Sequence, residues 1–241
     1  MKIVGIESSS LVASVAVLED ETLIAEYTVN YKKTHSQTLL PMLDEILTMT
    51  EQDLASVDGI AVSEGPGSFT GLRIGSATAK GLGLVLQKPL LAVPTVDAMA
   101  YQLFGCAHRI CPIMDARRQQ VYTGLYTFEE EFQVLQPARA VALTELLEEL
   151  SDKEGKTVFL GDGVPVFQKE IRETLGEHAL FAPAPCGRQR AAAVAALGLS
   201  YLRTGRTQTA AEHAPNYIRV SQAERELARK RAAAAQGERH E

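Results

Sequence analysis

The chain has 241 residues, of which 46% are hydrophobic and 22% are charged, so it can bury a core and is neither a disordered chain nor a small disulfide-framed protein. Twenty-four Lys and Arg against thirty Asp and Glu give a net charge of -6, which argues against a protein that grips a nucleic-acid backbone unaided. Three cysteines without a CxxC pair favour a reducing, cytoplasmic setting. The sequence begins strand-like and has no signal-peptide pattern or 20-residue apolar stretch, so we expect no membrane association.

Three short apolar runs separated by polar turns open the chain and predict a meander of three strands, at residues 2–7, 12–18 and 22–29. Apolar residues then recur at helical spacing, which predicts an amphipathic helix from residue 36. Next we expect a strand at residues 58–63 and a glycine-rich loop at residues 65–71. A helix of small residues at 70–86 and a further strand at 90–93 follow. The first half therefore has the order βββαβα.

The second half begins with the same order of elements. Three strands, a helix and a strand are predicted at residues 109–114, 121–128, 132–136, 143–150 and 157–160. The repeat predicts an α/β protein with a duplicated, actin-like and ribonuclease-H-like architecture and a cleft between its halves. We predict a first domain at residues 1–105 and a second domain at residues 106–190. A helix and segment at residues 191–220 would pack back on the first domain, and residues 221–241 would form a charged tail.

A glycine-rich loop connects a predicted strand to a predicted helix and is the first candidate site. Its backbone N–H groups beside a helix N-terminus would suit an anion, although glycines also serve a tight turn. Glu7, at the end of the first strand, could hold Mg²⁺ through water or could be a hydrogen-bonded turn residue. The candidate phosphate or nucleotide residues are Glu7, Ser8, Ser9, Gly65 and Gly67.

No residue pattern predicts catalysis. The five histidines are scattered, without an HxxxH or HExxH pair, so no metal site is expected. Cys106, His108 and Cys111 lie close together, but in an apolar region they favour core thiols and a surface imidazole. The sequence also lacks a GxSxG elbow, so no catalytic nucleophile is predicted.

Several segments together resemble one protein family: KIVGIESSS, THSQTLLPMLDEIL, AVSEGPGSFTGLRIGSATAKGLG, KPLLAVPTVDAMA and the late APNYIR. They are similar to the TsaB (YeaZ) family along nearly the whole chain, and the GPGSFTGLRIG segment is highly specific. The resemblance implies an actin-like fold of two domains with the second reduced, in a bacterial cytosolic protein that dimerises with the transferase TsaD. With TsaE, the pair would support threonylcarbamoyl transfer to N6 of adenosine 37, in tRNAs reading codons that begin with A.

The resemblance also implies that this chain is not itself the enzyme. TsaD follows its Pro-Leu segment with a His-x-x-x-His pair that holds the active-site metal, and on that register the present chain has Thr95 and Met99. A hydroxyl and a thioether do not make a plausible ligand set for such a metal. We therefore expect a pseudo-enzyme subunit that reaches tRNA only through the complex, homodimerises without TsaD, and binds ATP or ADP and Mg²⁺, if at all, at a composite site with its partners.

Two other functions fit parts of the sequence. An actin-like small-molecule kinase or ATP-binding protein would need an acid pair in the cleft and an adenosine loop, which Gly161-Asp162-Gly163 only faintly suggests. A metallopeptidase, an old label for this superfamily, would need the missing metal ligands. The missing cleft acids and the missing metal ligands both favour the pseudo-enzyme subunit over these two functions.

The predicted helices of the first domain supply the candidate partner interface: His35, Leu39, Leu40, Leu43, Arg73, Ile74 and Ala77. The apolar residues of the first helix occupy a wider arc around the helix axis than packing against one core requires. Every one of them could nevertheless face the internal sheet. Arg73 is expected in the first turn of the next helix, where its charge opposes the macrodipole. A partner carboxylate or a shared nucleotide phosphate would compensate, whereas a solvated arginine remains the alternative.

Overall fold

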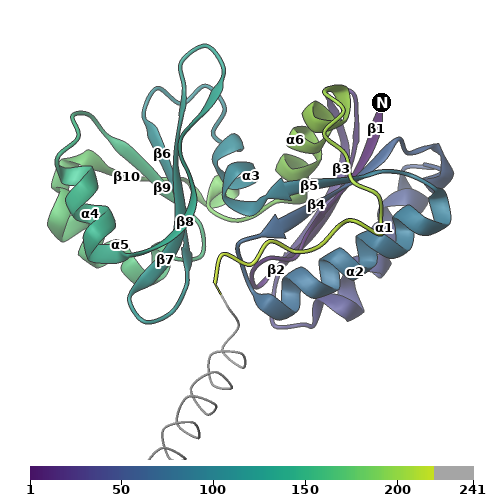
Figure 1. The fold of residues 1–241 in the computed structure, drawn as a ribbon, viewed down its shortest axis with the longest axis horizontal. Coiled ribbons are helices and arrows are strands. Elements are labelled where there is room, and N and C mark those ends of the chain that lie inside the picture. The colour runs from purple at the N-terminus through teal and green to yellow at the C-terminus, as the bar shows by residue number, and fades with distance from the viewer. Residues whose placement is uncertain (220–241) are drawn as a thin grey trace, which may run out of the picture.

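The computed structural model describes residues 1–219, and its first half forms a five-stranded mixed sheet (Figure 1). The strands are β1 (Lys2–Glu7), β2 (Val12–Glu19), β3 (Thr22–Asn30), β4 (Gly59–Gly65) and β5 (Leu90–Pro94). Their order in the sheet is β3-β2-β1-β4-β5. The meander β1-β2-β3 is antiparallel, whereas β4 and β5 extend the sheet in parallel on the other side of β1.

The second half forms another sheet with the same connectivity. Its strands are β6 (Arg109–Asp115), β7 (Gln120–Phe128), β8 (Phe132–Ala142), β9 (Thr157–Leu160) and β10 (Ala179–Phe181). The order β10-β9-β6-β7-β8 again places an antiparallel meander on one side of its first strand and two parallel strands on the other. This repeated topology confirms the predicted duplicated, actin-like fold. The predicted domain boundaries stay a prediction.

Helices cover both faces of the first sheet because its central strands carry apolar residues on both sides. Helices α1 (His35–Met49) and α2 (Phe69–Leu86) pack over one core, which includes Val4 and Ile6 of β1. Helix α6 (Ala191–Arg203) packs on the opposite face, over a core that includes Ile3. These elements form the first lobe.

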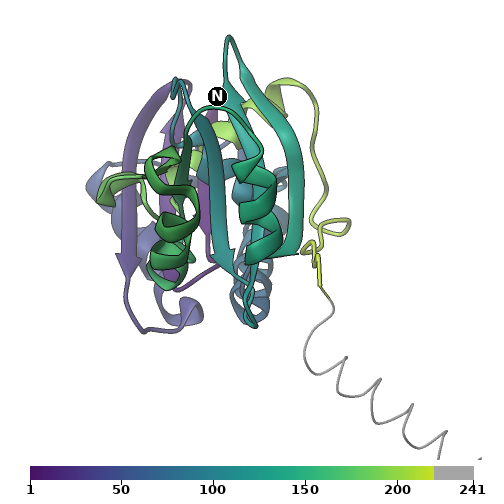
Figure 2. The ribbon, with the colours of Figure 1, turned by 90° about the vertical axis from the view of Figure 1, so that its left-hand side faces the viewer.

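The second lobe is the second sheet with α4 (Leu143–Ser151) and α5 (Val164–Leu175) on one face. Figure 2 shows these two helices side by side on the side of the lobe that faces away from the first lobe. Helix α3 (Thr95–Tyr101) covers the other face and also contacts α6. The helices α3 and α6 therefore lie between the two sheets.

After α6 the chain runs back along the first lobe as an extended segment, residues 207–219, which we call the strap (Figure 1). Gln208 and Leu90 exchange two backbone hydrogen bonds of 2.8 and 2.9 Å, so the strap covers the β5 edge at that point. Further along, Lys80 donates to the carbonyl oxygen of His213, and the N–H of Asn216 donates to that of Glu64 at 2.7 Å. These hydrogen bonds hold the strap to the first lobe from Gln208 to Asn216.

Three elements were not predicted from the sequence: α3, α5 and β10. Three short turns of 3-10 helix, at Leu54–Ser56, Gly176–His178 and Ala184–Cys186, complete the structure. The predicted charged tail lies outside the described residues. Within residues 1–219, none of the helices is both long and apolar enough to cross a membrane.

Candidate functional site

The two lobes meet at a cleft of about 660 Å³. Three kinds of segment line it: the β1-β2 turn with the start of α2 from the first lobe, the β6-β7 hairpin and Asp162 from the second lobe, and the end of the strap. The loop from Pro66 to Gly71 lies on its wall, as does the buried turn at Ser9. The sequence-predicted phosphate residues therefore do gather at or near one cleft.

Two backbone donors of the β1-β2 turn, those of Ser8 and Ser9, are already used within the chain. The N–H of Ser9 donates to Glu7 Oε1 at 2.6 Å, and the N–H of Ser8 points to Ser63 Oγ at 3.5 Å. The Ser8 hydroxyl donates to the carbonyl oxygen of Gly71 at 2.9 Å. A phosphate group could bind the N–H groups of Ser8 and Ser9 only by displacing these internal acceptors, so this part of the turn is not a free anion site in this chain alone.

The glycines of the adjacent loop serve close packing. A Cβ atom on Gly67 would lie 2.4 Å from the carbonyl oxygen of Ser9, and one on Gly71 would lie 2.0 Å from that of Ser8. Gly65 has a φ of 127°, which side chains rarely adopt. Ser68 caps α2 by accepting a hydrogen bond from the N–H of Gly71 at 3.3 Å. Of the two interpretations left open by the sequence, this geometry favours a structural turn.

Glu7 is buried beneath the cleft, with only 1% of its surface exposed. Burial raises the pKa of its carboxyl to about 7, although hydrogen bonds from Ser9 and Ser63 oppose the shift. The carboxyl of Asp162, whose pKa is also raised by burial, reinforces the shift from the second lobe. No group of three potential metal-binding side chains was found among residues 1–219.

Thr95 and Met99, the positions expected to replace a histidine pair, lie one turn apart on α3 and are fully buried. The Thr95 hydroxyl has no hydrogen-bond partner within the described part of the chain. The Met99 methyl group packs against the turn at Gly161, where a Cβ atom would lie 2.6 Å from it. At these two positions the structure therefore has a buried hydroxyl and a thioether packed against the Gly161 turn.

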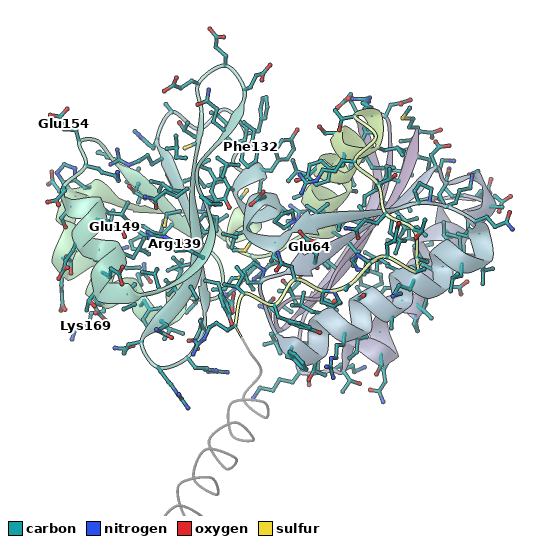
Figure 3. All side chains as sticks on the ribbon, viewed as in Figure 1. Glu64, Phe132, Arg139, Glu149, Glu154 and Lys169 are labelled. Atoms are coloured by element: carbon teal, nitrogen blue, oxygen red, sulfur yellow. The ribbon has the colours of Figure 1, made fainter. Side chains whose placement is uncertain are left out.

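Three polar side chains lie in the region between the two sheets: Asp97, Tyr126 and Glu64. The Tyr126 hydroxyl of β7 donates to Asp97 Oδ1 of α3 at 2.7 Å, and burial raises the pKa of both groups. Glu64 lies between the lobes at the end of β4 (Figure 3), and burial raises the pKa of its carboxyl while Arg206 opposes the shift. Glu64, Asp97 and Tyr126 are not among the residues that line the cleft.

The β6-β7 hairpin adds two arginines that sequence patterns did not single out. Arg117, Arg118 and Gln119 have φ angles of 64°, 57° and 55°, and all three are exposed. Arg117 pairs with Asp115 at 3.0 Å on the rim of the cleft. One sequence feature could have drawn attention to this hairpin. The DARRQ segment lies between two predicted strands and has no Gly or Asn, although such a tight turn usually carries one of them.

The structure divides the candidate interface residues into buried and exposed groups. Leu39 and Leu43 are 1% and 2% exposed and belong to the core, so including them in an interface was wrong: their side of α1 faces β2. His35 is also buried, and its Nε2 lies 2.8 Å from the carbonyl oxygen of Ser10. Leu40, Arg73 and Ala77 are exposed, whereas Ile74 is half-buried against the core.

Three further exposed apolar side chains lie on the same two helices and were missed. Met49 of α1 is 79% exposed, and Leu84 and Val85 of α2 are 66% and 83% exposed. With Leu40, at 52%, they form a set that we call the outer α1/α2 residues. A contact surface is indicated where exposed apolar side chains are contiguous, as Leu84 and Val85 are on α2.

Comparisons with known proteins agree along most of the chain. A family model described as TsaD, tRNA N6-adenosine threonylcarbamoyltransferase, matches residues 22–227. The tRNA threonylcarbamoyladenosine biosynthesis protein TsaB of Bacillus subtilis is 34% identical over 93% of this chain and 96% of its own length. TsaB of Escherichia coli is 34% identical over 68% of this chain and 72% of its length.

A more distant relative and a solved structure extend the comparison. The tRNA N6-adenosine threonylcarbamoyltransferase of Persephonella marina is 27% identical over 77% of this chain and 58% of its own length. The structure of YeaZ from Pseudomonas aeruginosa superimposes with a TM-score of 0.74 at 25% identity, covering 90% of this chain and 99% of that one. Similarity to TsaB of Bacillus subtilis thus extends over 96% of that protein, whereas the transferase is considerably longer than the aligned region.

Proposed function

Because the chain belongs to the TsaD family, and within it to the TsaB (YeaZ) proteins of tRNA threonylcarbamoyladenosine biosynthesis, we propose that it is the non-catalytic subunit that dimerises with TsaD and activates it. The observation that carries this proposal is the burial of Thr95 and Met99, with the Met99 thioether packed against the Gly161 turn. A fold that duplicates the transferase architecture but replaces its ligand pair by buried core side chains has lost the means to hold the metal.

The partner surface in this proposal is the outer face of α1 and α2. The two helices contact each other and expose Leu40, Met49, Leu84 and Val85 on the first lobe. Burying such side chains against a partner removes apolar surface from water, at roughly 25 cal/mol per Å². Since TsaD has related helices, the same face would pair with TsaD or, without it, with a second copy of this chain.

TsaE and tRNA enter the proposal only through the assembled complex. The net charge of -6 gives this chain little attraction for tRNA by itself, so the complex would supply the contact. Any ATP or ADP with Mg²⁺ would bind at a composite site with the partners, because the N–H groups of Ser8 and Ser9 have internal acceptors. The same hydrogen bonds argue against the alternative of a small-molecule kinase.

The test is titration calorimetry of the purified chain with purified TsaD. We expect the Leu40→Glu and Val85→Glu variants to stay folded and to lose at least tenfold in affinity, because each would place a carboxylate in an apolar contact. Val166→Glu is the matched control, since Val166 is 58% exposed on α5 of the second lobe. Full affinity in both helix variants would remove this face from the proposed interface.

A second experiment tests the non-catalytic role. The chain alone should show no threonylcarbamoyl transferase or peptidase activity and should contain no stoichiometric Zn²⁺ or Fe, and adding it to TsaD and TsaE should raise tRNA modification. Chelator-sensitive turnover by the purified chain would overturn the proposal. Modification by TsaD at the same rate with or without the chain would do so too.

A further inference from the structure

Arg73 is held in a stack of three side chains that we call the Arg73 clamp: Arg73, Phe69 and Tyr217. The guanidinium carbon of Arg73 lies 4.0 Å from the centroid of the Phe69 ring. The Phe69 and Tyr217 rings are themselves 4.5 Å apart, with 30° between their planes. Arg73 Nε also donates to the Tyr217 hydroxyl at 3.3 Å. An exposed arginine on a helix surface would ordinarily sample many rotamers, whereas this one is restrained on two sides.

Neither helix electrostatics nor an ion pair explains this arrangement. Arg73 is the fifth residue of α2, just after the first turn where it was expected, and its charge still lies near the positive end of the helix. Within residues 1–219 no carboxylate lies within salt-bridge distance of it, and neither Nη nitrogen has a hydrogen-bond partner. The clamp therefore uses Nε and the face of the guanidinium while leaving its two terminal nitrogens available.

Tyr217 reaches Arg73 from a distant part of the chain. It lies 144 residues later, in the strap, and the adjacent Asn216 is fixed to the first lobe by the hydrogen bond from its N–H to the carbonyl oxygen of Glu64. The clamp is thus built by tertiary structure. It also gives a physical role to the late APNYIR segment, which contains Asn216 and Tyr217 and which no site has so far used.

We infer that Arg73 is a preformed docking point for a carboxylate of the partner subunit, and that Tyr217 is the residue that positions it. This inference rests on the proposed function, because it places an acidic group of TsaD beside the outer α1/α2 residues. Two parallel hydrogen bonds from the Nη nitrogens would match a carboxylate. The clamp would lower the entropy lost on binding, since the guanidinium is already oriented.

Calorimetric titration of the full chain with TsaD, without nucleotide, tests this inference. Arg73→Ala should weaken binding by about 10-fold or more, since it removes both charged hydrogen bonds to the partner carboxylate. Arg73→Lys should restore only part of the affinity because an ammonium lacks the planar fork. Tyr217→Phe, which removes only the hydroxyl, should weaken binding by roughly 3- to 10-fold. Arg172→Ala is the matched control: its guanidinium carbon lies 4.9 Å from the Phe181 ring, on α5 of the second lobe.

The outcomes separate the inference from the proposed function. If wild-type chain and TsaD do not bind, the proposed function fails. If they bind and Arg73→Ala leaves the affinity unchanged, the docking point is overturned while the partner role stands. The Arg73→Ala/Tyr217→Phe double variant then tests positioning: strongly non-additive losses support it, and additive losses overturn it. Thermal unfolding of each lone variant shows whether a loss of affinity is only a loss of fold.

Discussion

Arg219 donates a hydrogen bond of 2.9 Å from Nη1 to the carbonyl oxygen of Ala116, which joins the end of the strap to the β6-β7 hairpin. The rest of the strap is held by the first lobe, through Leu90, Lys80 and Glu64. One backbone segment therefore spans both lobes beside the cleft, and Arg219 supplies its contact with the hairpin of the second lobe. Ala116 directly precedes the three residues with positive φ.

The first prediction concerns this link. Arg219→Ala should raise the hydrogen-exchange rates of amides in the hairpin 116–120 by several-fold, because the hairpin loses a tertiary contact that restrains an uncommon backbone conformation. Mass-spectrometric exchange of the hairpin peptide measures the effect. Arg203→Ala is a suitable control, since Arg203 pairs with the exposed Glu21 on the first lobe. Unchanged exchange in the hairpin would show that the strap does not restrain the second lobe.

The second prediction separates the two neighbouring leucines of α1. Leu39→Ala should reduce the free energy of unfolding by about 2–5 kcal/mol, since it leaves a cavity in the first-lobe core. Leu40→Ala should change it by less than about 0.5 kcal/mol because half of that side chain is already exposed. Urea unfolding of both variants measures the difference. Equal effects would contradict the assignment of Leu39 to the core and Leu40 to the surface.

The third prediction compares two glycines of α2. Gly71→Ala should destabilise the chain by about 1–3 kcal/mol, because the added methyl group would meet the carbonyl oxygen of Ser8 at 2.0 Å. Gly81→Ala should stabilise it by about 0.5–1 kcal/mol, since the site is open and alanine favours a helix. Thermal unfolding distinguishes them. A well-tolerated Gly71→Ala would mean that the turn at Ser8 moves easily, and would reopen this loop to a ligand role.

The elements that were missed from the sequence differ in how much signal they carried. Helix α5 has Phe167, Ile171 and Leu175 on one side, a helical spacing that could have been found. Helix α3 had no such pattern, because it lies between two sheets and most of its residues are buried. Strand β10 has only three residues, all half-buried, and pairs only with β9. The helical spacing in α5 was therefore present but overlooked, whereas α3 and β10 carried no pattern to find.

The candidate site was predictable in its residue types but less so in its contacts. The glycine-rich loop and Glu7 could be placed at strand ends, and the structure brings both to the cleft region. The hydrogen bond from the N–H of Ser9 to Glu7 depends on side-chain geometry. The spacing of residues along the sequence does not determine that geometry. The Arg73 clamp was beyond prediction for another reason, since Tyr217 lies 144 residues away and an isolated helix gives no hint of it.

The last prediction uses the buried carboxyl of Glu7. Its pKa is about 7 in the folded chain and 4.5 for an ordinary glutamate, so the folded state binds a proton more tightly than the unfolded state. Protonation of Glu7 therefore stabilises the folded chain. Its contribution to the free energy of unfolding is fully present below about pH 4.5 and is lost as the pH rises through about 7, and the total loss is about 3 kcal/mol. Glu7→Gln keeps an acceptor for the N–H of Ser9 but carries no charge at any pH.

The free energy of unfolding of Glu7→Gln, relative to wild type, should therefore increase with pH between about 5 and 8. Urea unfolding across this interval measures the trend. The neighbouring carboxyl of Asp162, which also has a raised pKa, is present in both proteins, so most of its own contribution cancels in the difference. Glu129→Gln, at an exposed hairpin position, is the control and should run parallel to wild type. A parallel curve for Glu7→Gln would mean that Glu7 stays ionised in the folded chain, and that water or a cation reaches it beneath the cleft.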